Sequence, residues 1–299
     1  MSPILVIGRS GQLARSLAER GAARGLELRF AARPDLDLAR PETLRRAVAE
    51  SGAAIVVNAA AHTAVDQAED EPEAAHALNA VAPGVLAEAA REQGARLIHV
   101  STDYVFDGSG ERPWREEDPT GPSSVYGRTK LAGEAAVRAA LPDHVILRTA
   151  WVYSPFGRNF VRTMLSLAGT RDALTVVGDQ VGNPTSALDI ADGILAAVAA
   201  WETEPARGTG ETYHLAGTGS ASWADFAREI FALSRARGGP FAEVRDIASA
   251  DWPAKAPRPL NSRLASDKFA AAFGYRAPDW RASLAPVVER LLGEIAPKD

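Results

Sequence analysis

Short apolar runs alternate with longer stretches rich in alanine and leucine through the first half of the chain. Five of the short runs are rich in valine, isoleucine or leucine, as buried parallel strands are, and they predict strands at 4–7, 27–30, 54–58, 96–101 and 145–148. The stretches between them space leucine and alanine three and four residues apart, which predicts helices at 12–24, 41–51, 75–93 and 124–140. Because strands that alternate with helices build βαβ units, the pattern predicts an α/β fold with a doubly wound parallel sheet of the Rossmann type.

After about residue 150 the helices and strands no longer alternate regularly. The second half predicts helices at 159–167, 187–201, 222–237, 266–273 and 280–295, strands at 174–177 and 212–215, and a proline-rich loop at 251–263. The helix at 187–201 and the strand at 212–215 continue the pattern of the sheet. We therefore expect a dinucleotide-binding domain formed by residues 1–150 plus about 185–216, and a smaller substrate domain formed by residues 151–184 plus about 217–299.

Composition excludes several classes of function. Apolar residues make up 46% and charged residues 24% of the 299 residues, which is ordinary for a globular protein. The net charge of −5 argues against nucleic-acid binding through a basic surface. The absence of cysteine excludes disulfides, zinc–thiolate sites and a cysteine nucleophile. No run approaches the roughly 18 apolar residues of a membrane-spanning helix, so we expect a cytoplasmic protein with no membrane partner.

A glycine-rich turn connects the first predicted strand to the first predicted helix. Gly8 and Gly11 are followed by Gln12, Leu13 and the small residue Ala14. Such a turn lets the backbone approach an anion closely, and the helix start directs free N–H groups and a positive dipole end at it. The turn therefore predicts a site for a dinucleotide pyrophosphate, although a tight turn without a ligand would have a similar sequence.

The residues after the second predicted strand bear on the choice between NAD and NADP. A carboxylate there would bind the ribose hydroxyls, whereas a cation would accept a 2′-phosphate. This chain has Arg33 at that point and Arg9 in the glycine turn. We therefore expect NADPH, with NADH possible and with two solvated arginines as the alternative. Asp37 and Leu38, a few residues later, are expected at the adenine end of the cofactor.

Tyr126 and Lys130 are four residues apart at the start of a predicted helix and so share one face. An ammonium group beside a phenol favours the tyrosinate form, so Lys130 is expected to lower the pKa of Tyr126 toward the range of a general acid. Lys130 is one of only four lysines in the chain, at a place where an arginine would be too basic and too rigid. Thr102 follows a predicted strand at the edge where ligands bind. The three residues predict a catalytic site, although a tyrosine and a lysine at this spacing also occur by chance.

Several segments together carry a family resemblance. The glycine turn and residues 58–66, 101–108 and 126–134 resemble the extended short-chain dehydrogenase/reductases and, within them, the dTDP-4-dehydrorhamnose reductase family. Residues 148–153, 179–185, 213–215 and 258–262 also match that family, so the resemblance covers nearly the whole chain. The resemblance implies NAD(P)H-dependent reduction of the 4-keto group of dTDP-4-dehydro-L-rhamnose to dTDP-L-rhamnose.

The resemblance also implies roles for individual residues. Tyr126 would donate the proton, Lys130 would tune its pKa and bind the ribose, and Thr102 would hydrogen-bond the substrate oxygen. The expected cofactor residues are Gly8, Gly11, Gln12, Leu13, Ala59, Ala60, Ala61 and Thr63, together with Tyr126 and Lys130. The expected substrate residues are Asp103, Tyr104, Trp151, Arg258 and Asn261, with a solvated loop arginine as the alternative for Arg258.

No metal site is expected. Asp66, Glu69, Asp70 and Glu71 form an acidic cluster, which we interpret as the carboxylate-rich start of a helix. Some family members bind magnesium at a dimer interface through an acidic residue early in the first helix. Because this chain has Arg15 and Ser16 there, we expect a monomer or a homodimer without that metal link.

Two other functions stay open at the level of sequence. The first is another reductase or epimerase of nucleotide-linked deoxysugars, because the shape of the sugar pocket sets the stereochemistry. The second is a non-catalytic subunit, such as the regulatory subunit of methionine adenosyltransferase, which resembles the same family. The presence of Thr102, Tyr126 and Lys130 argues against the second.

Overall fold

A six-stranded parallel sheet forms the centre of the large lobe in the computed structural model, which describes residues 3–295. Its strand order is β10-β5-β4-β3-β1-β2, and every neighbouring pair is parallel. The strands are β1 (Ile4–Ile7), β2 (Leu28–Ala31), β3 (Ile55–Asn58), β4 (Arg96–Thr102), β5 (His144–Thr149) and β10 (Glu211–His214). The order reverses beside β1, as in doubly wound folds, so the predicted Rossmann-type sheet is confirmed.

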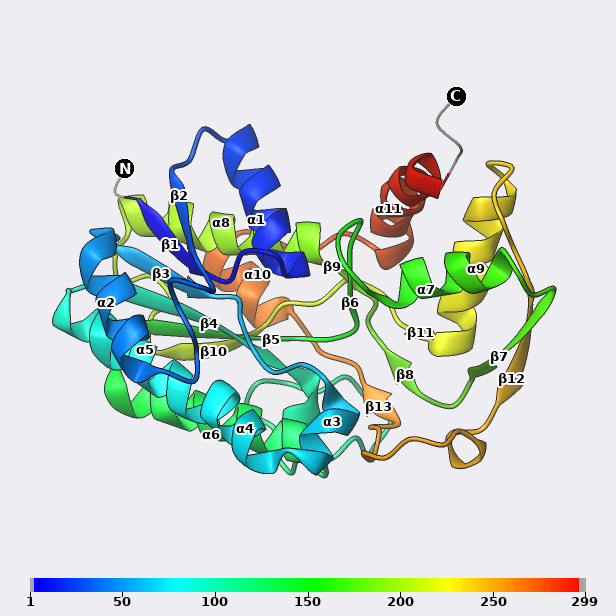
Figure 1. Cartoon of the computed structure of the whole chain (residues 1–299), viewed down its shortest axis with the longest axis horizontal. Coiled ribbons are helices and arrows are strands. Elements are labelled where there is room, and N and C mark those ends of the chain that lie inside the picture. Colours follow the sequence, from blue (N-terminus) through cyan, green and yellow to red (C-terminus); the bar gives the residue numbers. More distant parts are fainter. Residues whose placement is uncertain (1–2, 296–299) are drawn as a thin grey trace.

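Helices cover both faces of this sheet (Figure 1). One layer contains α1 (Gln12–Ala23), α8 (Ala187–Thr203) and α10 (Asp267–Phe273), and the other contains α2 (Pro41–Ser51), α5 (Ala82–Glu92) and α6 (Val125–Ala140). Successive residues of β1 alternate between the two cores: Ile4 and Val6 pack with the first layer, and Leu5 and Ile7 with the second. Burial on both faces explains why the strands are continuous apolar runs rather than alternating ones.

The helix predicted at 75–93 is divided into shorter segments. After the short helix α3 (Val65–Asp70), the chain forms α4 (Pro72–His76), the π-helical segment η1 (Ala77–Val81) and then α5. Buried Asn79 lies in η1, accepts a hydrogen bond from the backbone N–H of His62 and donates to the Thr129 hydroxyl. The wider turn of η1 therefore coincides with a polar side chain that ties this segment to α6 and to the loop after β3.

The parts of the second half of the chain that do not belong to the large sheet and its helices form a smaller lobe around an aromatic core. Tyr153, Phe226 and Trp280 are buried there. The helices of this lobe are α7 (Phe160–Ala168), α9 (Trp223–Arg235) and α11 (Trp280–Ile295). Its strands form three small sheets: β11 (Ala221–Ser222) with β8 (Val181–Gly182) and β13 (Asn261–Ser262); β12 (Glu243–Ile247) with β7 (Ala173–Val177); and β6 (Val152–Tyr153) with β9 (Thr185–Ser186).

Several elements of the smaller lobe differ from the sequence prediction. The two-residue strands β6, β8, β9 and β11 were not predicted, because runs this short carry no pattern. Strand β12 was not predicted, because its residues are mostly exposed and carry no apolar alternation. The segment 251–263 was predicted as a loop, but it contains β13 and continues from the 3-10 turn η3 (Ser249–Asp251). The chain returns to the large sheet through α8 and β10. The division into two domains at about residues 150, 184 and 216 stays a prediction.

Replacement of Gly133 by alanine tests the close packing of α6 on η1. A Cβ atom at Gly133 would lie 2.1 Å from the backbone oxygen of Asn79, so the two segments would have to move apart. We expect Gly133→Ala to lower the free energy of unfolding by about 1–3 kcal/mol, the usual cost of overpacking. In α11, Gly293→Ala is the matched control, because a Cβ there meets nothing within 4 Å. The control should be neutral or stabilising by up to about 1 kcal/mol in denaturant titrations; equal effects of both substitutions would contradict the close packing.

Candidate active site

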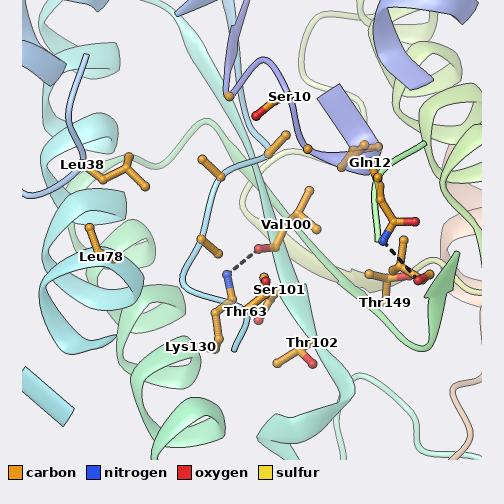
Figure 2. A pocket seen from close by; sticks show the side chains of 18 of the residues that line it. Ser10, Gln12, Leu38, Thr63, Leu78, Val100, Ser101, Thr102, Lys130 and Thr149 are labelled. Carbon is orange, nitrogen blue, oxygen red and sulfur yellow. Dashed lines mark hydrogen bonds between the residues drawn. The ribbon is translucent and has the colours of Figure 1, made fainter. Parts of the chain in front are cut away.

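A cleft of about 890 Å³ opens at the carboxyl ends of the large sheet's strands. Every predicted cofactor residue lines it, as do the three predicted catalytic residues. Of the predicted substrate residues, Asp103, Tyr104 and Trp151 line it. Figure 2 shows Ser10 and Gln12 on one side of the cleft, Leu38 and Leu78 on another, and Thr102, Lys130 and Thr149 along its base. The strand order reverses here, which is where open α/β sheets bind their ligands.

The glycine turn forms one wall of the cleft. Gly8 has a φ of +114°, a backbone conformation that residues with a side chain rarely adopt. Its N–H donates a hydrogen bond to the carbonyl of Ala31. Gly11 is the N-cap of α1 and provides no side-chain cap, so the first N–H groups of the helix remain available to an anion. Gln12 fixes this turn to the smaller lobe: its amide donates to the carbonyl of Val152 at 3.4 Å and accepts from the Ser154 hydroxyl at 2.8 Å.

The end of β2 carries no carboxylate. Ala31 is the last residue of the strand, Ala32 follows it, and exposed Arg33 lines the cleft beyond them. Arg9 also lines the cleft, where its guanidinium donates to the carbonyl of Phe30 at 3.1 Å. Asp37 lines the cleft but accepts a hydrogen bond from the N–H of Ala39. This wall is therefore cationic nearest to the strand and acidic only further along the loop.

Lys130 and Tyr126 come from the first turns of α6, whose start is fixed by Ser124. The Ser124 hydroxyl accepts a hydrogen bond from the N–H of Gly127 as an N-cap. The ammonium group of Lys130 is buried and donates to the carbonyl of Val100 at 2.7 Å (Figure 2). Burial lowers the pKa of Lys130 to about 8, while the negative charge of Glu134 opposes this shift.

The phenol of Tyr126 is buried, and its pKa is raised above the usual value. Burial is the main cause, the charges of Asp103 and Tyr104 add to it, and a hydrogen bond with Thr102 opposes it. The expectation that Lys130 lowers this pKa is therefore wrong for this structure. The ammonium donates to a backbone carbonyl instead, and the loss of water around the phenol is the main cause of its raised pKa.

Thr102 and Asp103 form a buried pair at the end of β4. The Thr102 hydroxyl donates to one carboxylate oxygen of Asp103 at 2.9 Å and accepts from the N–H of Tyr104 at 3.2 Å. The other oxygen of Asp103 is buried without a partner in the structure. Burial raises the pKa of Asp103 to about 6, although hydrogen bonds from Ser262 and Thr102 oppose the shift.

Trp151 lies at the junction of the two lobes in a strained conformation. Its φ is +47°, and its ring stacks on Trp223 with a centroid distance of 3.6 Å. A Cβ atom at Gly182 would lie 2.5 Å from the indole, so only glycine leaves room for this ring. A non-glycine residue at positive φ costs free energy and persists only where its surroundings hold it. Since Trp151 lines the cleft, its contacts with Trp223 and Gly182 hold an aromatic surface at the site.

Arg258 and Asn261 do not line the cleft. The Asn261 amide donates to the carbonyls of Ser109 and Arg112. These bonds hold Asn261 against the loop that contains Ser109 and Arg112. Arg258 pairs with Asp66 at 2.8 Å and lies beside Tyr104. Burial raises the pKa of Tyr104 to about 12, and the charge of Arg258 partly opposes this shift. Their assignment as substrate residues stays a prediction.

The acidic cluster binds other parts of the chain. Asp66 accepts from Ala256 N–H and pairs with Arg258, Asp70 pairs with Lys255, and Glu69 accepts from the N–H of Val125 at the start of α6. Within residues 3–295, no group of three or more histidine or acidic side chains could hold a metal ion. The carboxylates of α3 therefore fasten the 251–263 segment over the large lobe.

Residues that the sequence analysis did not single out also line the cleft: Ser10, Leu36, Val65, Leu78, Val100, Ser101, Thr149, Val152, Gly157, Arg158 and Ile190. Thr149 is the most informative of them, because its hydroxyl is buried and has no partner in the structure. It ends β5 as Thr102 ends β4, and the two are paired in register. The same rule that selected Thr102, a hydroxyl at the end of a parallel strand, would have found it.

Arg15 and Ser16, where a magnesium-binding acid was considered, have intramolecular contacts. The guanidinium of Arg15 lies 4.3 Å from the centre of the Phe156 ring, and the buried Ser16 hydroxyl donates to the carbonyl of Gln12. The expected oligomeric state, a monomer or a homodimer, stays a prediction. No helix of the described residues is long and apolar enough to cross a membrane.

The parallel sheet, the glycine turn at its switch point and the Thr102–Tyr126–Lys130 group define an NAD(P)-dependent oxidoreductase of the extended short-chain dehydrogenase/reductase class. A family model described as "RmlD substrate binding domain" matches residues 1–292. A dTDP-4-dehydrorhamnose reductase of Sinorhizobium fredii is 45% identical over 97% of this chain and 98% of its own length. The chain is therefore a member of the dTDP-4-dehydrorhamnose reductase family.

Two further relatives extend the comparison. A crystal structure of dTDP-4-dehydrorhamnose reductase from Bacillus anthracis in complex with NADP superimposes with a TM-score of 0.88 at 30% identity, covering 98% of this chain and 99% of that one. A probable dTDP-4,6-dihydroxy-2-methyloxan-3-one 4-ketoreductase of Streptomyces antibioticus is 43% identical over 94% of this chain and 92% of its own length. These relatives favour a reductase over the epimerase and the non-catalytic subunit considered above.

Asp103 gives the stability of the protein a predictable pH dependence. Its pKa is about 6 in the folded chain, against an ordinary value of 3.8, so between these values the folded state holds a proton that the unfolded state has lost. Stability is therefore lost as the pH rises through this window, by up to ~3 kcal/mol. We expect Asp103→Asn to gain stability relative to the natural protein between pH 4 and pH 7, measured by urea unfolding. A stability difference that is the same at both pH values would contradict the raised pKa.

Proposed function

We propose that the chain catalyses the NADPH-dependent reduction of the 4-keto group of dTDP-4-dehydro-L-rhamnose to dTDP-L-rhamnose. The observation that carries the proposal is that Thr102, Tyr126 and Lys130 line one cleft together with the glycine turn. The names of the relatives support the same reaction. One relative is named for the reduction of another 4-keto sugar. Assays with several dTDP-4-keto sugars therefore have to test which sugar this chain reduces.

The residues of the cleft fit a dinucleotide. Gly8 has a φ of +114°, which favours glycine, and a Cβ atom at Gly11 would meet nothing within 4 Å, so the pyrophosphate can approach the backbone of this turn. The uncapped start of α1 provides N–H donors to the phosphates. Arg33 and Arg9 would hold the 2′-phosphate, while Asp37 and Leu38 would contact the adenosine. When bound, NADPH supplies the hydride that reduces C4 of the sugar.

Tyr126 would donate the proton to the substrate oxygen. Because its pKa is raised by burial, the phenol keeps its proton until a stronger base faces it. The oxygen that gains negative charge during reduction is such a base. Lys130 is charged at neutral pH with a pKa of about 8, so its ammonium would stabilise the tyrosinate that remains and would also bind the ribose hydroxyls.

Thr102 would be a second hydrogen-bond donor to the same oxygen. In the structure its hydroxyl donates to Asp103, so the substrate oxygen competes with the carboxylate for that hydrogen. The competition favours the substrate more as the oxygen becomes negative, which is the condition for stabilising a transition state rather than a ground state. Thr149, with its free buried hydroxyl, would contact the nicotinamide end of the cleft.

The sugar nucleotide would lie between the lobes. Trp151 and Tyr104 would provide aromatic surface to the deoxysugar, and Asp103 would accept hydrogen bonds from its hydroxyls. Arg258 and Asn261 belong to the segment that α3 fastens over the large lobe. We propose that they contact the diphosphate after this segment adjusts to the bound substrate.

Tyr126→Phe removes the proton donor and leaves the ring in place. We expect the rate of sugar reduction to fall by about 10²–10⁴, the usual contribution of a positioned acid, while NADPH binding is preserved. Thr102→Val should cause a smaller loss, because it removes one hydrogen bond and keeps the shape. The assay is oxidation of NADPH with dTDP-4-dehydro-L-rhamnose. Tyr275→Phe, a tyrosine outside the cleft, is the matched control; if Tyr126→Phe also keeps most of the turnover, Tyr126 is not the acid.

Arg33→Ala tests the preference for NADPH. An exposed charge contact contributes about 1 kcal/mol or less, so we expect the Kd for NADPH to rise by about fivefold. The Kd for NADH should stay nearly unchanged, because NADH has no 2′-phosphate. Exposed Arg171, outside the cleft, is the matched control as Arg171→Ala. Equal losses for both cofactors, or none, would show that Arg33 does not bind the phosphate.

A further inference from the structure

Glu134 is a fully buried carboxylate near the middle of α6, and four hydrogen bonds meet at it. One oxygen accepts from the Ser101 hydroxyl at 2.6 Å and from Nε of Arg148 at 2.9 Å. The other accepts from Nη2 of Arg148 at 2.8 Å and from Nη2 of Arg138 at 2.7 Å. Arg148 is itself 3% exposed. Charged groups removed from water to this extent lose hydration that their pairing only partly recovers, so such a cluster is weak evidence for stabilisation alone.

The partners of Glu134 lie at the carboxyl ends of the two strands that form the base of the cleft. Ser101 lies on β4 between Val100 and Thr102, and Arg148 lies on β5. Lys130, one helical turn before Glu134, donates to the carbonyl of Val100. Two adjacent residues of β4 are therefore bonded to two side chains on one face of α6. These bonds set the position of Lys130 relative to Thr102.

We propose that Glu134 is a positioning residue for the reductase site: through Ser101 and Arg148 it holds α6 against the ends of β4 and β5, and its charge keeps Lys130 protonated. The inference rests on the proposed function only in assigning Lys130 a role in the reaction. Its electrostatic part concerns Lys130 itself and holds whatever the substrate is.

Among the groups around Lys130, Glu134 is the anion that raises the Lys130 pKa. On α6, Glu134 and Tyr126 share its face; on β4 it faces His99, whose pKa is lowered by burial and by the charge of Lys130, so that the imidazole is neutral. Other charged or titratable groups of this region include Arg148 and His144 on β5, His214 on β10, Arg138 on α6, and Asp103 and Tyr104 after β4. Burial lowers the pKa of Lys130, and the charge of Glu134 is what opposes that shift. Arg148 and the hydrogen bonds hold the pKa of Glu134 below its usual value despite its burial, so the carboxylate stays charged.

The sign of the effect follows from these charges. Lys130 must carry its proton for the reaction, so kcat/KM falls as the pH rises through the Lys130 pKa. Glu134→Gln keeps the size of the side chain and an acceptor for Ser101 but removes the charge. The Lys130 pKa should then fall by about one unit or more, and the alkaline limb of the pH profile of kcat/KM should move down by the same amount.

Ser101→Ala separates position from charge. It removes the hydroxyl that connects β4 to Glu134 and leaves the carboxylate paired with both arginines. We expect kcat/KM to fall several-fold at every pH, with the alkaline limb unmoved. Arg138→Gln acts in the opposite sense: removing a half-exposed positive charge beside Glu134 should move the limb slightly to higher pH. This variant also keeps the test available if Glu134→Gln does not fold.

The Lys130 pKa can be measured without turnover. The chain has only four lysines, so protein labelled with ¹³C at lysine Cε gives few signals, and Lys130→Gln assigns the one that belongs to Lys130. The titration of that signal should have a pKa near 8 in the natural protein and a lower one in Glu134→Gln. Two results together would overturn the proposal. The first is a Lys130 pKa that is unchanged in Glu134→Gln, and the second is an alkaline limb of kcat/KM that does not move to higher pH in Arg138→Gln. Failure to reduce any sugar would overturn the proposed function alone, because this titration does not depend on it.

Discussion

The close approach of α6 to the segments beside β4 is the constraint on which the rest of the site depends. A Cβ atom at Gly127 would lie 2.2 Å from the carbonyl oxygen of Tyr104, and one at Gly133 would lie 2.1 Å from that of Asn79. Glycines at both points let the helix pack on backbone rather than on side chains. This packing buries Tyr126 and Lys130 beside Thr102, and burial in turn accounts for both of their pKa shifts. Position and acidity in this site therefore have the same physical origin.

The second half of the chain completes the cleft through a small number of contacts. Gln12, in the glycine turn, is bonded to Val152 and Ser154 of the segment that follows β5. Trp151, in the same segment, is held at positive φ between Trp223 and Gly182. The acidic residues of α3 then fasten the 251–263 segment across the opposite side. Residues 149–158 therefore join the glycine turn to the smaller lobe at the cleft, whereas no residue of the 251–263 segment is among those that line it.

The sequence predicts the large sheet well because buried parallel strands are continuous apolar runs, and β1, β3 and β4 differ from their predicted bounds by at most one residue. The glycine turn and the Tyr126–Lys130 pair are local patterns, so they too could be found, and all the predicted cofactor residues line the cleft. Burial and long-range pairing are not local. The bonds of Asn261 join segments that are 149 and 152 residues apart, and the exposed strand β12 carries no apolar pattern. The raised pKa of Tyr126 depends on its burial in the folded chain. Glu134 illustrates the same limit, since it lies on α6 and its buried partner Arg148 lies on β5, so only the fold brings the two together.

The central claim is that this cleft transfers hydride to C4 of a nucleotide-linked 4-keto sugar. The most direct measurement is incubation of the protein with dTDP-4-dehydro-L-rhamnose and NADPH deuterated at the transferable position, followed by NMR and mass spectrometry of the product. We expect dTDP-L-rhamnose that carries one deuterium, at C4, in a stoichiometric ratio to the NADPH oxidised. If NADPH is oxidised only with a different dTDP-4-keto-6-deoxy sugar, that sugar replaces dTDP-4-dehydro-L-rhamnose as the proposed substrate. Deuterium at another carbon, or no cofactor oxidation with any such sugar, would contradict the claim.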